Sequence, residues 1–196
     1  MKQTIITHLR ESAELKLRLA KESADVVEDI ANLVIKALKS RGKILLFGNG
    51  GSAADAQHIA AEFINRFQRE RRALPAIALT TDTSIITSIG NDSSFSHIFS
   101  RQIEALGKKG DIAWAISTSG KSRNVISALK TARELGLHTI GFTGQTGDKM
   151  KDLVDLAIQV PSRSTPRIQE VHITVAHIIC ELAEEAFWSA EGSLKR

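Results

Sequence analysis

The sequence has no tyrosine, one cysteine and three prolines in 196 residues, and each scarcity narrows the classes of protein to consider. A single thiol, Cys180, cannot form an internal disulfide, so we expect a reducing compartment and predict a cytoplasmic protein. Cys180 lies in the apolar stretch VAHIICELA, which favours a buried bystander over a reactive thiol. No run of about 18 apolar residues is present, so no membrane partner is expected. The first residues mix charges with apolar positions, unlike a secretory signal.

Aromatic residues are also scarce, at 5% of the chain, which leaves few platforms on which bases could stack. The net charge of +4 would suit an acidic partner, but the basic residues are scattered along the chain. The densest cluster, residues 69–72, includes an acid. We therefore predict a solvated basic face and no nucleic-acid partner.

The length is sufficient for one well-filled core, and no proline- or glycine-rich linker divides the chain. Residues 3–40 repeat apolar positions at three- and four-residue spacing, which predicts one long helix or two consecutive helices. A basic stretch and Gly42 mark the end of this helical part. We predict one domain over 1–196, with an N-terminal helical extension (1–40), an α/β core (43–160) and a C-terminal helix (166–190).

Within the core, short apolar runs alternate with helical patterns. This order predicts a doubly wound, five-stranded parallel sheet with helices on both faces. The expected strands are 43–47, 75–79, 111–116, 138–142 and 156–160, and the expected helices are 52–67, 95–106, 122–135 and about 147–153. The last helix is apolar on most of its circumference, so we expect it to pack against the N-terminal helices or a neighbouring subunit.

In a doubly wound sheet, ligands bind at the carboxyl ends of the strands. Four segments follow predicted strands at that edge and are treated as loops: 48–52, 80–92, 117–122 and 143–147. Apart from the last helix, the chemistry-bearing residues of the chain lie in these loops or in the helices that they open.

The first loop, Gly48-Asn49-Gly50-Gly51-Ser52, combines three glycines with a hydroxyl at the start of a helix. Glycine allows a tight turn close to a ligand, and amides at a helix N-terminus favour an anion. The alternative is a strand–helix turn that binds nothing. A dinucleotide site is weakly supported, because the nearest candidate for the ribose-binding acid, Asp82, lies 34 residues after Gly48 instead of about 20.

The second loop, residues 117–122, reads STSGKS and follows a predicted strand directly. Its end resembles a nucleotide-binding P-loop, but that motif needs a glycine where this chain has Ala115. Four hydroxyls, a glycine and a lysine at a strand–helix junction are well suited to one phosphoryl group. The alternative is a serine-rich helix cap. Two such loops together predict a small phosphorylated metabolite as ligand.

Two helices carry the candidate acid–base and metal-binding side chains. His58 and Glu62 are four residues apart, so both face one side of the helix that begins at Ser52. Gln169 and His177 are eight residues apart, about two turns, and share roughly one side of the last helix. Taken singly, each is better explained as a packed or surface residue, and the spacing does not establish that the two helices meet. The remaining histidines, at positions 8, 97, 138 and 172, are expected to be structural or on the surface.

Five motifs in this order resemble the sugar isomerase (SIS) superfamily, and within it the phosphoheptose isomerases. They are GNGGS (48–52), QHIAAE (57–62), SIGND (88–92), ISTSG (116–120) and RIQEVH (167–172), and the similarity covers nearly the whole chain. The resemblance implies a flavodoxin-like SIS domain in a homotetramer, with active sites where subunits meet. The implied reaction converts sedoheptulose 7-phosphate to D-glycero-D-manno-heptose 7-phosphate through an enediol, toward heptose for surface polysaccharide.

The resemblance also implies roles for individual residues. Glu62 matches the base that acts on carbon, and His177 matches its acid–base partner. The positions matching substrate-binding residues are Asn49, Gly50, Gly51, Ser52, Arg66, Asn91, Asp92, Ser117, Thr118, Ser119, Ser122 and Gln169. Some relatives bind zinc at the positions of His58, Glu62, Gln169 and His177, which are suitable ligand types here.

The chain departs from the family pattern at Lys121, where asparagine is usual, and at Pro166, where some members have a substrate-binding acid. These departures concern hydroxyl and phosphate recognition rather than the type of reaction.

The main alternative function is that of a non-enzymatic SIS protein that binds the bacterial replication initiator. Such proteins typically lack the glutamate or the histidine, whereas this chain has both Glu62 and His177. Another SIS sugar-phosphate isomerase, or a module that senses sugar phosphates, is the remaining alternative.

Overall fold

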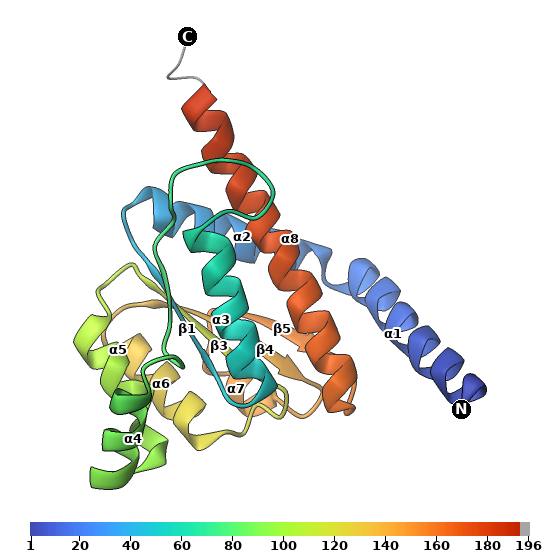
Figure 1. Ribbon diagram of the computed structural model, residues 1–196, viewed down its shortest axis with the longest axis horizontal. Helices are drawn as coiled ribbons and strands as arrows, with labels where there is room; N and C mark the ends of the chain where they lie inside the picture. The colour runs from blue at the N-terminus through green and yellow to red at the C-terminus, as the bar shows by residue number, and fades with distance from the viewer. Residues whose placement is uncertain (193–196) are drawn as a thin grey trace.

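A computed structural model describes residues 1–192, with side chains described as far as residue 188. Its sheet has five parallel strands in the order β2-β1-β3-β4-β5, as predicted for a doubly wound, flavodoxin-like domain. The strands are β1 (Ile44–Gly48), β2 (Ala76–Ala78), β3 (Ile112–Ser117), β4 (His138–Gly144) and β5 (Leu156–Val160). Figure 1 shows helices in front of the sheet and behind it.

The helices divide between two apolar cores, one on each face of the sheet. The helices are α1 (Lys2–Glu22), α2 (Ala24–Lys39), α3 (Gly51–Ile64), α4 (Thr83–Asp92), the 3-10 turn η1 (Phe95–His97), α5 (Ser100–Leu106), α6 (Arg123–Glu134), α7 (Asp148–Lys151) and α8 (Thr165–Gly192). One core contains buried side chains of α2, α3 and α8. The other contains those of α5, α6 and α7. Covering both faces in this way is what an all-parallel sheet requires.

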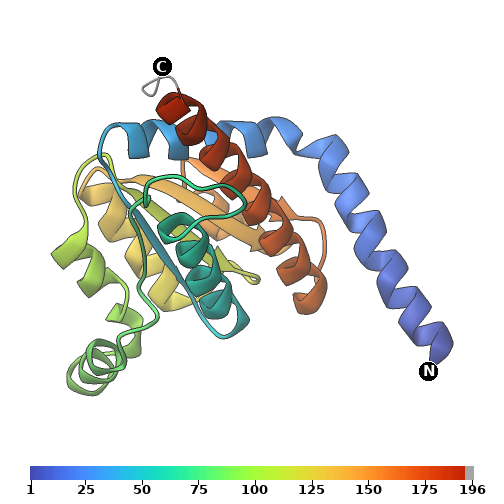
Figure 2. The ribbon, with the colours of Figure 1, turned by 45° about the horizontal axis from the view of Figure 1, so that its top comes forward.

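The N-terminal part forms two helices, since α1 ends at Glu22 and α2 begins at Ala24. Helix α8 packs against α1, α2 and α3, with Val175 and Ile179 fully buried. The expected packing of the last helix against the N-terminal helices is therefore confirmed. Figure 2 shows α1 extending away from the sheet, and Leu9 and Leu17 on this helix are exposed.

The segment 80–92 was expected to be a loop, and this expectation is wrong over residues 83–92, which form α4. The Asp82 carboxylate caps the helix by accepting a hydrogen bond from the Ile85 amide at 2.9 Å. Ile86 and Ile89 pack against the core that contains α5 and α6. With ten residues and no fully buried side chain, α4 has too short an apolar pattern to be recognised by periodicity.

The helix expected over 52–67 ends at Ile64, and the chain from there to β2 is irregular. The helix expected over 95–106 is divided into η1 and α5. Ser94 supplies the reason for the irregular start, because its hydroxyl accepts a hydrogen bond from the Ser96 amide at 3.1 Å. Such local bonds compete with regular helix formation.

Candidate active site

The two glycine- and serine-rich loops lie side by side because β1 and β3 are neighbours in the sheet. Gly48, the last residue of β1, pairs with Ile116 of β3. The strand order reverses direction between these strands, which is where doubly wound domains bind ligands. Asn49 and Asn124 exchange side-chain amide hydrogen bonds of 3.0 and 2.8 Å, which ties the first loop to the start of α6. The two predicted loops therefore lie next to each other at one edge of the sheet.

The first loop needs glycine at specific positions. Gly50 has φ of +55°, in the left-handed region that favours glycine. Gly51 begins α3, and a Cβ there would collide with the side-chain amide of Gln169 on α8. The tight contact at Gly51 therefore lets the N-terminal ends of α3 and α8 approach closely, and it fixes where Gln169 lies.

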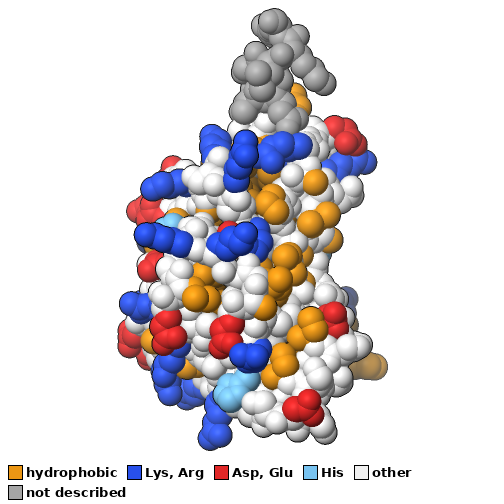
Figure 3. Space-filling view, turned by 90° about the vertical axis from the view of Figure 1, so that its left-hand side faces the viewer, with side chains coloured by type: hydrophobic (Ala, Val, Ile, Leu, Met, Phe, Trp, Pro, Cys, Tyr) orange, Lys and Arg blue, Asp and Glu red, His pale blue; other side chains and the backbone are white. Residues whose placement is uncertain are grey.

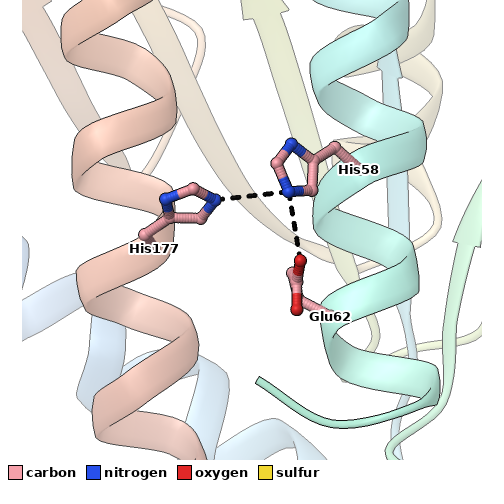
Figure 4. A group of neighbouring side chains, drawn as sticks. All are labelled: His58, Glu62 and His177. Atoms are coloured by element: carbon pink, nitrogen blue, oxygen red, sulfur yellow. Dashed lines mark hydrogen bonds and ion pairs between the residues drawn. The ribbon is translucent and has the colours of Figure 1, made fainter. Parts of the chain in front are cut away.

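Helices α3 and α8 run in the same direction and bring His58, Glu62 and His177 together. The His58 Nε2 atom lies 3.0 Å from the Glu62 carboxylate and 3.4 Å from the His177 Nε2 atom, as Figure 4 shows. The two imidazole rings meet edge to face, with centroids 4.9 Å apart. The sequence did not establish that these helices meet, and the structure shows that they do.

The surroundings of His177 favour its neutral form. Partial burial lowers the pKa of His177, and the neighbouring His58 lowers it further, while the Glu62 carboxylate acts in the opposite direction. The ring of Phe67, just beyond α3, lies 5.4 Å from the His177 ring. A neutral imidazole can accept a proton or bind a metal, so both chemistries remain open to it.

The donor set suits a zinc ion. One ligand atom from each of His58, Glu62 and His177 lies within 4.8 Å of the other two. Two nitrogens bound to zinc at about 2.0–2.1 Å with tetrahedral angles would be roughly 3.4 Å apart. The separation of the two Nε2 atoms is 3.4 Å. Gln169, the fourth expected ligand, lies two turns before His177 and contacts Gly51.

Two residues of the second loop, Thr118 and Ser119, line a cavity. The Ser117 and Ser122 hydroxyls are 3.3 Å apart, and the Ser119 hydroxyl accepts a hydrogen bond from the Lys121 amide. Gly120 has φ of +62° and lies directly against Gly147, so the loop is held in one shape. A cavity of about 320 Å³ beside it is lined by Thr118, Ser119, Thr146, Ser162, Arg163, Thr165 and Ile168.

Other predicted substrate-binding residues lie on separate elements. The side chain of Asn91 donates to Asp92 at the end of α4, and Arg66 is paired with Glu70. Among the residues whose side chains are described, Arg66, Asn91 and Asp92 make no hydrogen bond or ion pair with His58, Glu62 or His177. Their predicted role in holding the sugar remains a prediction.

Three residues at the site were not singled out in the sequence. Arg163 follows β5 and lines the cavity of the second loop, so its position after a strand was the available signal. Asp55 precedes His58 by one turn; burial raises its pKa, and one carboxylate oxygen has no hydrogen-bond partner among the described residues. Phe67 falls within the helix predicted over 52–67, but the structure places it in irregular chain after α3.

Among the histidines expected to be structural, His172 is 1% exposed. It lies 3.2 Å from the Thr143 carbonyl through Nε2. Cys180 is likewise buried, and burial raises the pKa of its thiol, as expected of a bystander. No helix in the described part of the chain is long and apolar enough to span a bilayer.

Comparison with known proteins agrees with the fold and the motifs. The SIS domain family matches residues 7–144. The phosphoheptose isomerase of Thermodesulfovibrio yellowstonii is 51% identical over 186 residues, covering 95% of this chain and 92% of that protein. The phosphoheptose isomerase of Aquifex aeolicus is 57% identical over 176 residues, covering 90% and 92%.

A solved phosphoheptose isomerase from Neisseria gonorrhoeae superposes with a TM-score of 0.88 at 43% identity. The superposition covers 94% of this chain and 98% of the other. Both the sequence likeness and the structural likeness thus extend over nearly the full length of each protein. The chain belongs to the phosphoheptose isomerase family of SIS-domain proteins.

Proposed function

We propose that this protein is an aldose–ketose isomerase that converts sedoheptulose 7-phosphate to D-glycero-D-manno-heptose 7-phosphate. The observation that carries the proposal is the convergence of Glu62 and His177 from two helices, of which α3 begins in the glycine-rich loop at the carboxyl end of β1. The relatives reported above, 51% and 57% identical, are named for this class of reaction.

The reaction moves two hydrogens and needs no external oxidant. The Glu62 carboxylate removes a proton from C1 of the ketose, the electron pair forms the C1–C2 double bond, and the C2 carbonyl oxygen gains a proton. The resulting enediol loses the proton on O1 and regains one on C2 from Glu62, which yields the aldose. When no metal ion occupies its Nε2 atom, His177, whose lowered pKa favours the neutral form, exchanges the protons on O1 and O2. General acid–base groups typically contribute on the order of 10²- to 10⁴-fold each.

Phosphate binding is assigned to the second loop. Ser117, Thr118, Ser119 and Ser122 supply hydroxyls, and Arg163 on the cavity wall supplies a positive charge. Arg163 has no hydrogen-bond or ion-pair partner among the side chains that the structure describes, so its donors are available to a phosphate. The first loop, with Asn49, Gly50, Gly51 and Ser52, and the side chain of Gln169 would orient the sugar.

We also propose that zinc binds to His58, Glu62 and His177, with Gln169 as a further ligand. When bound, the ion would stabilise negative charge on the enediolate oxygens as a Lewis acid. A carboxylate has two oxygens, so Glu62 can offer one to the ion and keep the other for the carbon-bound proton.

The proposal is tested by incubating the purified protein with sedoheptulose 7-phosphate and following the product by NMR. Conversion to the aldose is expected. Failure to convert, together with capture of the replication initiator in a pull-down, would favour the non-enzymatic alternative. The presence of Glu62 and His177 in contact with His58 argues for the enzyme.

A homotetramer with shared active sites is a further part of the proposal. Exposed apolar side chains support association, among them Leu9 and Leu17 on α1 and Ile77 on the edge strand β2. Figure 3 shows hydrophobic side chains running in a broken column down the face that includes this edge. A neighbouring subunit would bring residues such as Arg66 and Asp92 to the sugar. A single domain over 1–196, a cytoplasmic location and a role in lipopolysaccharide synthesis remain predictions.

A further inference from the structure

The chain between α3 and β2 is anchored by one buried ion pair, formed by Arg71 of this segment and Glu184 of α8. The Arg71 Nε atom lies 3.5 Å from the Glu184 carboxylate, and the two side chains are 1% and 2% exposed. Figure 1 shows this segment crossing α8 just beyond the end of α3. Charged side chains are rarely this buried unless they are paired and hydrogen-bonded.

Arg71 caps the C-terminal end of α3. The last carbonyls of a helix lack partners within the helix and carry partial negative charge. The Arg71 guanidinium donates to the carbonyl of Glu62 at 2.7 Å and to the carbonyl of Phe63 at 2.9 Å. It also donates to the carbonyls of Asn65 and Arg72, at 3.2 and 2.9 Å. One side chain therefore fixes the backbone of Glu62 itself.

Glu184 of α8 holds the residues just after α3 against α8. Its carboxylate accepts hydrogen bonds from the amides of Phe67, Gln68 and Arg69 at 2.8, 2.7 and 2.8 Å. Burial by itself would raise the pKa of Glu184, but these three amides and Arg71 outweigh burial, and the pKa is lowered. The carboxylate is therefore charged and bound on both oxygens.

The pair lies between the elements that carry the proposed catalytic groups. Glu184 follows His177 by seven residues, about two turns of α8, and Arg71 binds the backbone of Glu62 on α3. The same segment carries Phe67, whose ring lies 5.4 Å from that of His177. A change in this pair would shift α3 relative to α8, and with it the separation of Glu62 and His177.

We propose that Arg71 and Glu184 are positioning residues, which set the geometry between Glu62 and His177 without touching the substrate. This inference rests on the proposed function of Glu62 and His177. Misplacement of reacting groups by about 1 Å can cost on the order of 10²-fold in rate. Arg71 and Glu184 contact each other and residues 62–72 rather than the phosphate-binding loop at 117–122, so loss of the pair should lower kcat more than it raises KM.

The test separates positioning from simple stability. Removing one partner leaves an unpaired buried charge, whereas replacing both with apolar residues is often tolerated by the fold. We would therefore compare Arg71→Lys, Glu184→Gln and the double variant Arg71→Met/Glu184→Leu. Each is assayed at a temperature where near-UV circular dichroism reports a folded protein, with kcat and KM measured separately. Lysine keeps the charge but cannot reach four carbonyls, so Arg71→Lys should retain only a small part of the wild-type kcat.

The matched control is Glu185→Gln, which alters the next residue of α8 and its exposed ion pair with Arg69, at 3.7 Å. We expect kcat within about twofold of wild type for this control. The folded double variant should lose on the order of 10²-fold in kcat, with KM changed less than about threefold. Wild-type kcat in any folded variant of the pair would overturn the positioning role. A wild-type protein that does not isomerise the sugar would instead overturn the proposed function, and the positioning role with it.

Discussion

His58 and His177 are 119 residues apart in the sequence, yet their Nε2 atoms lie 3.4 Å from each other. This contact exists because α3 and α8 run side by side and in the same direction. Gln169 meets Gly51 near the start of both helices, and Glu184 holds the residues that follow α3. The parallel pair of helices therefore aligns the ligand-type side chains in register.

The zinc proposal predicts that His58→Gln weakens zinc binding. Loss of a residue that only orients a ligand typically costs 10- to 100-fold in metal affinity, so loss of a ligand should cost at least about tenfold. Zinc content is measured by elemental analysis, and affinity by titration of protein first treated with a chelator. The control is His8→Gln, on the exposed surface of α1, which should bind zinc as wild type does. Equal affinity in His58→Gln would contradict the assignment.

Arg163 is expected to bind the substrate phosphate. Hydrogen bonds to charged groups contribute about 1.5–3 kcal/mol, so Arg163→Gln should raise KM about tenfold or more with little change in kcat. Arg101→Gln, which removes an exposed arginine paired with Glu104, serves as the control. An unchanged KM in Arg163→Gln would show that the hydroxyls of the second loop bind phosphate without this guanidinium.

Gly51→Ala is predicted to displace Gln169. The added Cβ would occupy the space of the Gln169 amide, which is the flexible end of a side chain and can move away. The melting temperature should change little, while KM should rise three- to tenfold because a hydrogen bond to the sugar is lost. Unchanged kinetics in Gly51→Ala would argue against a role for Gln169 in orienting the sugar.

Stability should depend on pH through His172. Burial lowers the pKa of His172 to about 4, and the hydrogen bond to the Thr143 carbonyl offsets part of this effect. The Nδ1 atom has no hydrogen-bond partner among the described residues, so protonation would create an unpaired buried N–H group. The unfolded chain takes up this proton near pH 6.5 and the folded chain only near pH 4.

Between these values the unfolded state binds more protons, so the free energy of unfolding should fall as pH is lowered from about 6.5 to about 4. The loss from this residue is on the order of 3 kcal/mol. Urea unfolding across this range is the measurement. His172→Gln should flatten the dependence, whereas His97→Gln, an exposed histidine, should leave it unchanged. An equally steep dependence in His172→Gln would contradict this account.

The sheet and the order of its strands were predictable from the sequence, because five apolar runs separated by helical patterns admit few other arrangements. Three of those runs end in the loops at the candidate site, 48–52, 117–122 and 143–147. Helix α4 was not predictable in this way. Its contact with the core is made by Ile86 and Ile89, and its N-terminus is capped by Asp82, which is too weak a pattern to identify a helix. Local hydrogen bonding and packing decided its structure.

The candidate residues could be identified from the sequence, but their convergence could not. Spacing places His58 and Glu62 on one side of a helix, and only tertiary packing brings His177 to them. Arg71 and Glu184 gave no signal, since a basic run and an acid in a helix are ordinary surface patterns. Their burial depends on the path of the irregular segment after α3.

The role of Glu62 as the base that moves the carbon-bound proton is tested most directly by isomerisation in deuterium oxide. The wild-type protein should exchange the C1 hydrogen of sedoheptulose 7-phosphate and form the aldose carrying deuterium at C2, both observed by NMR. Glu62→Gln should bind the substrate, yet show neither exchange nor product above background. Exchange and turnover at the wild-type rate in Glu62→Gln would contradict the mechanism.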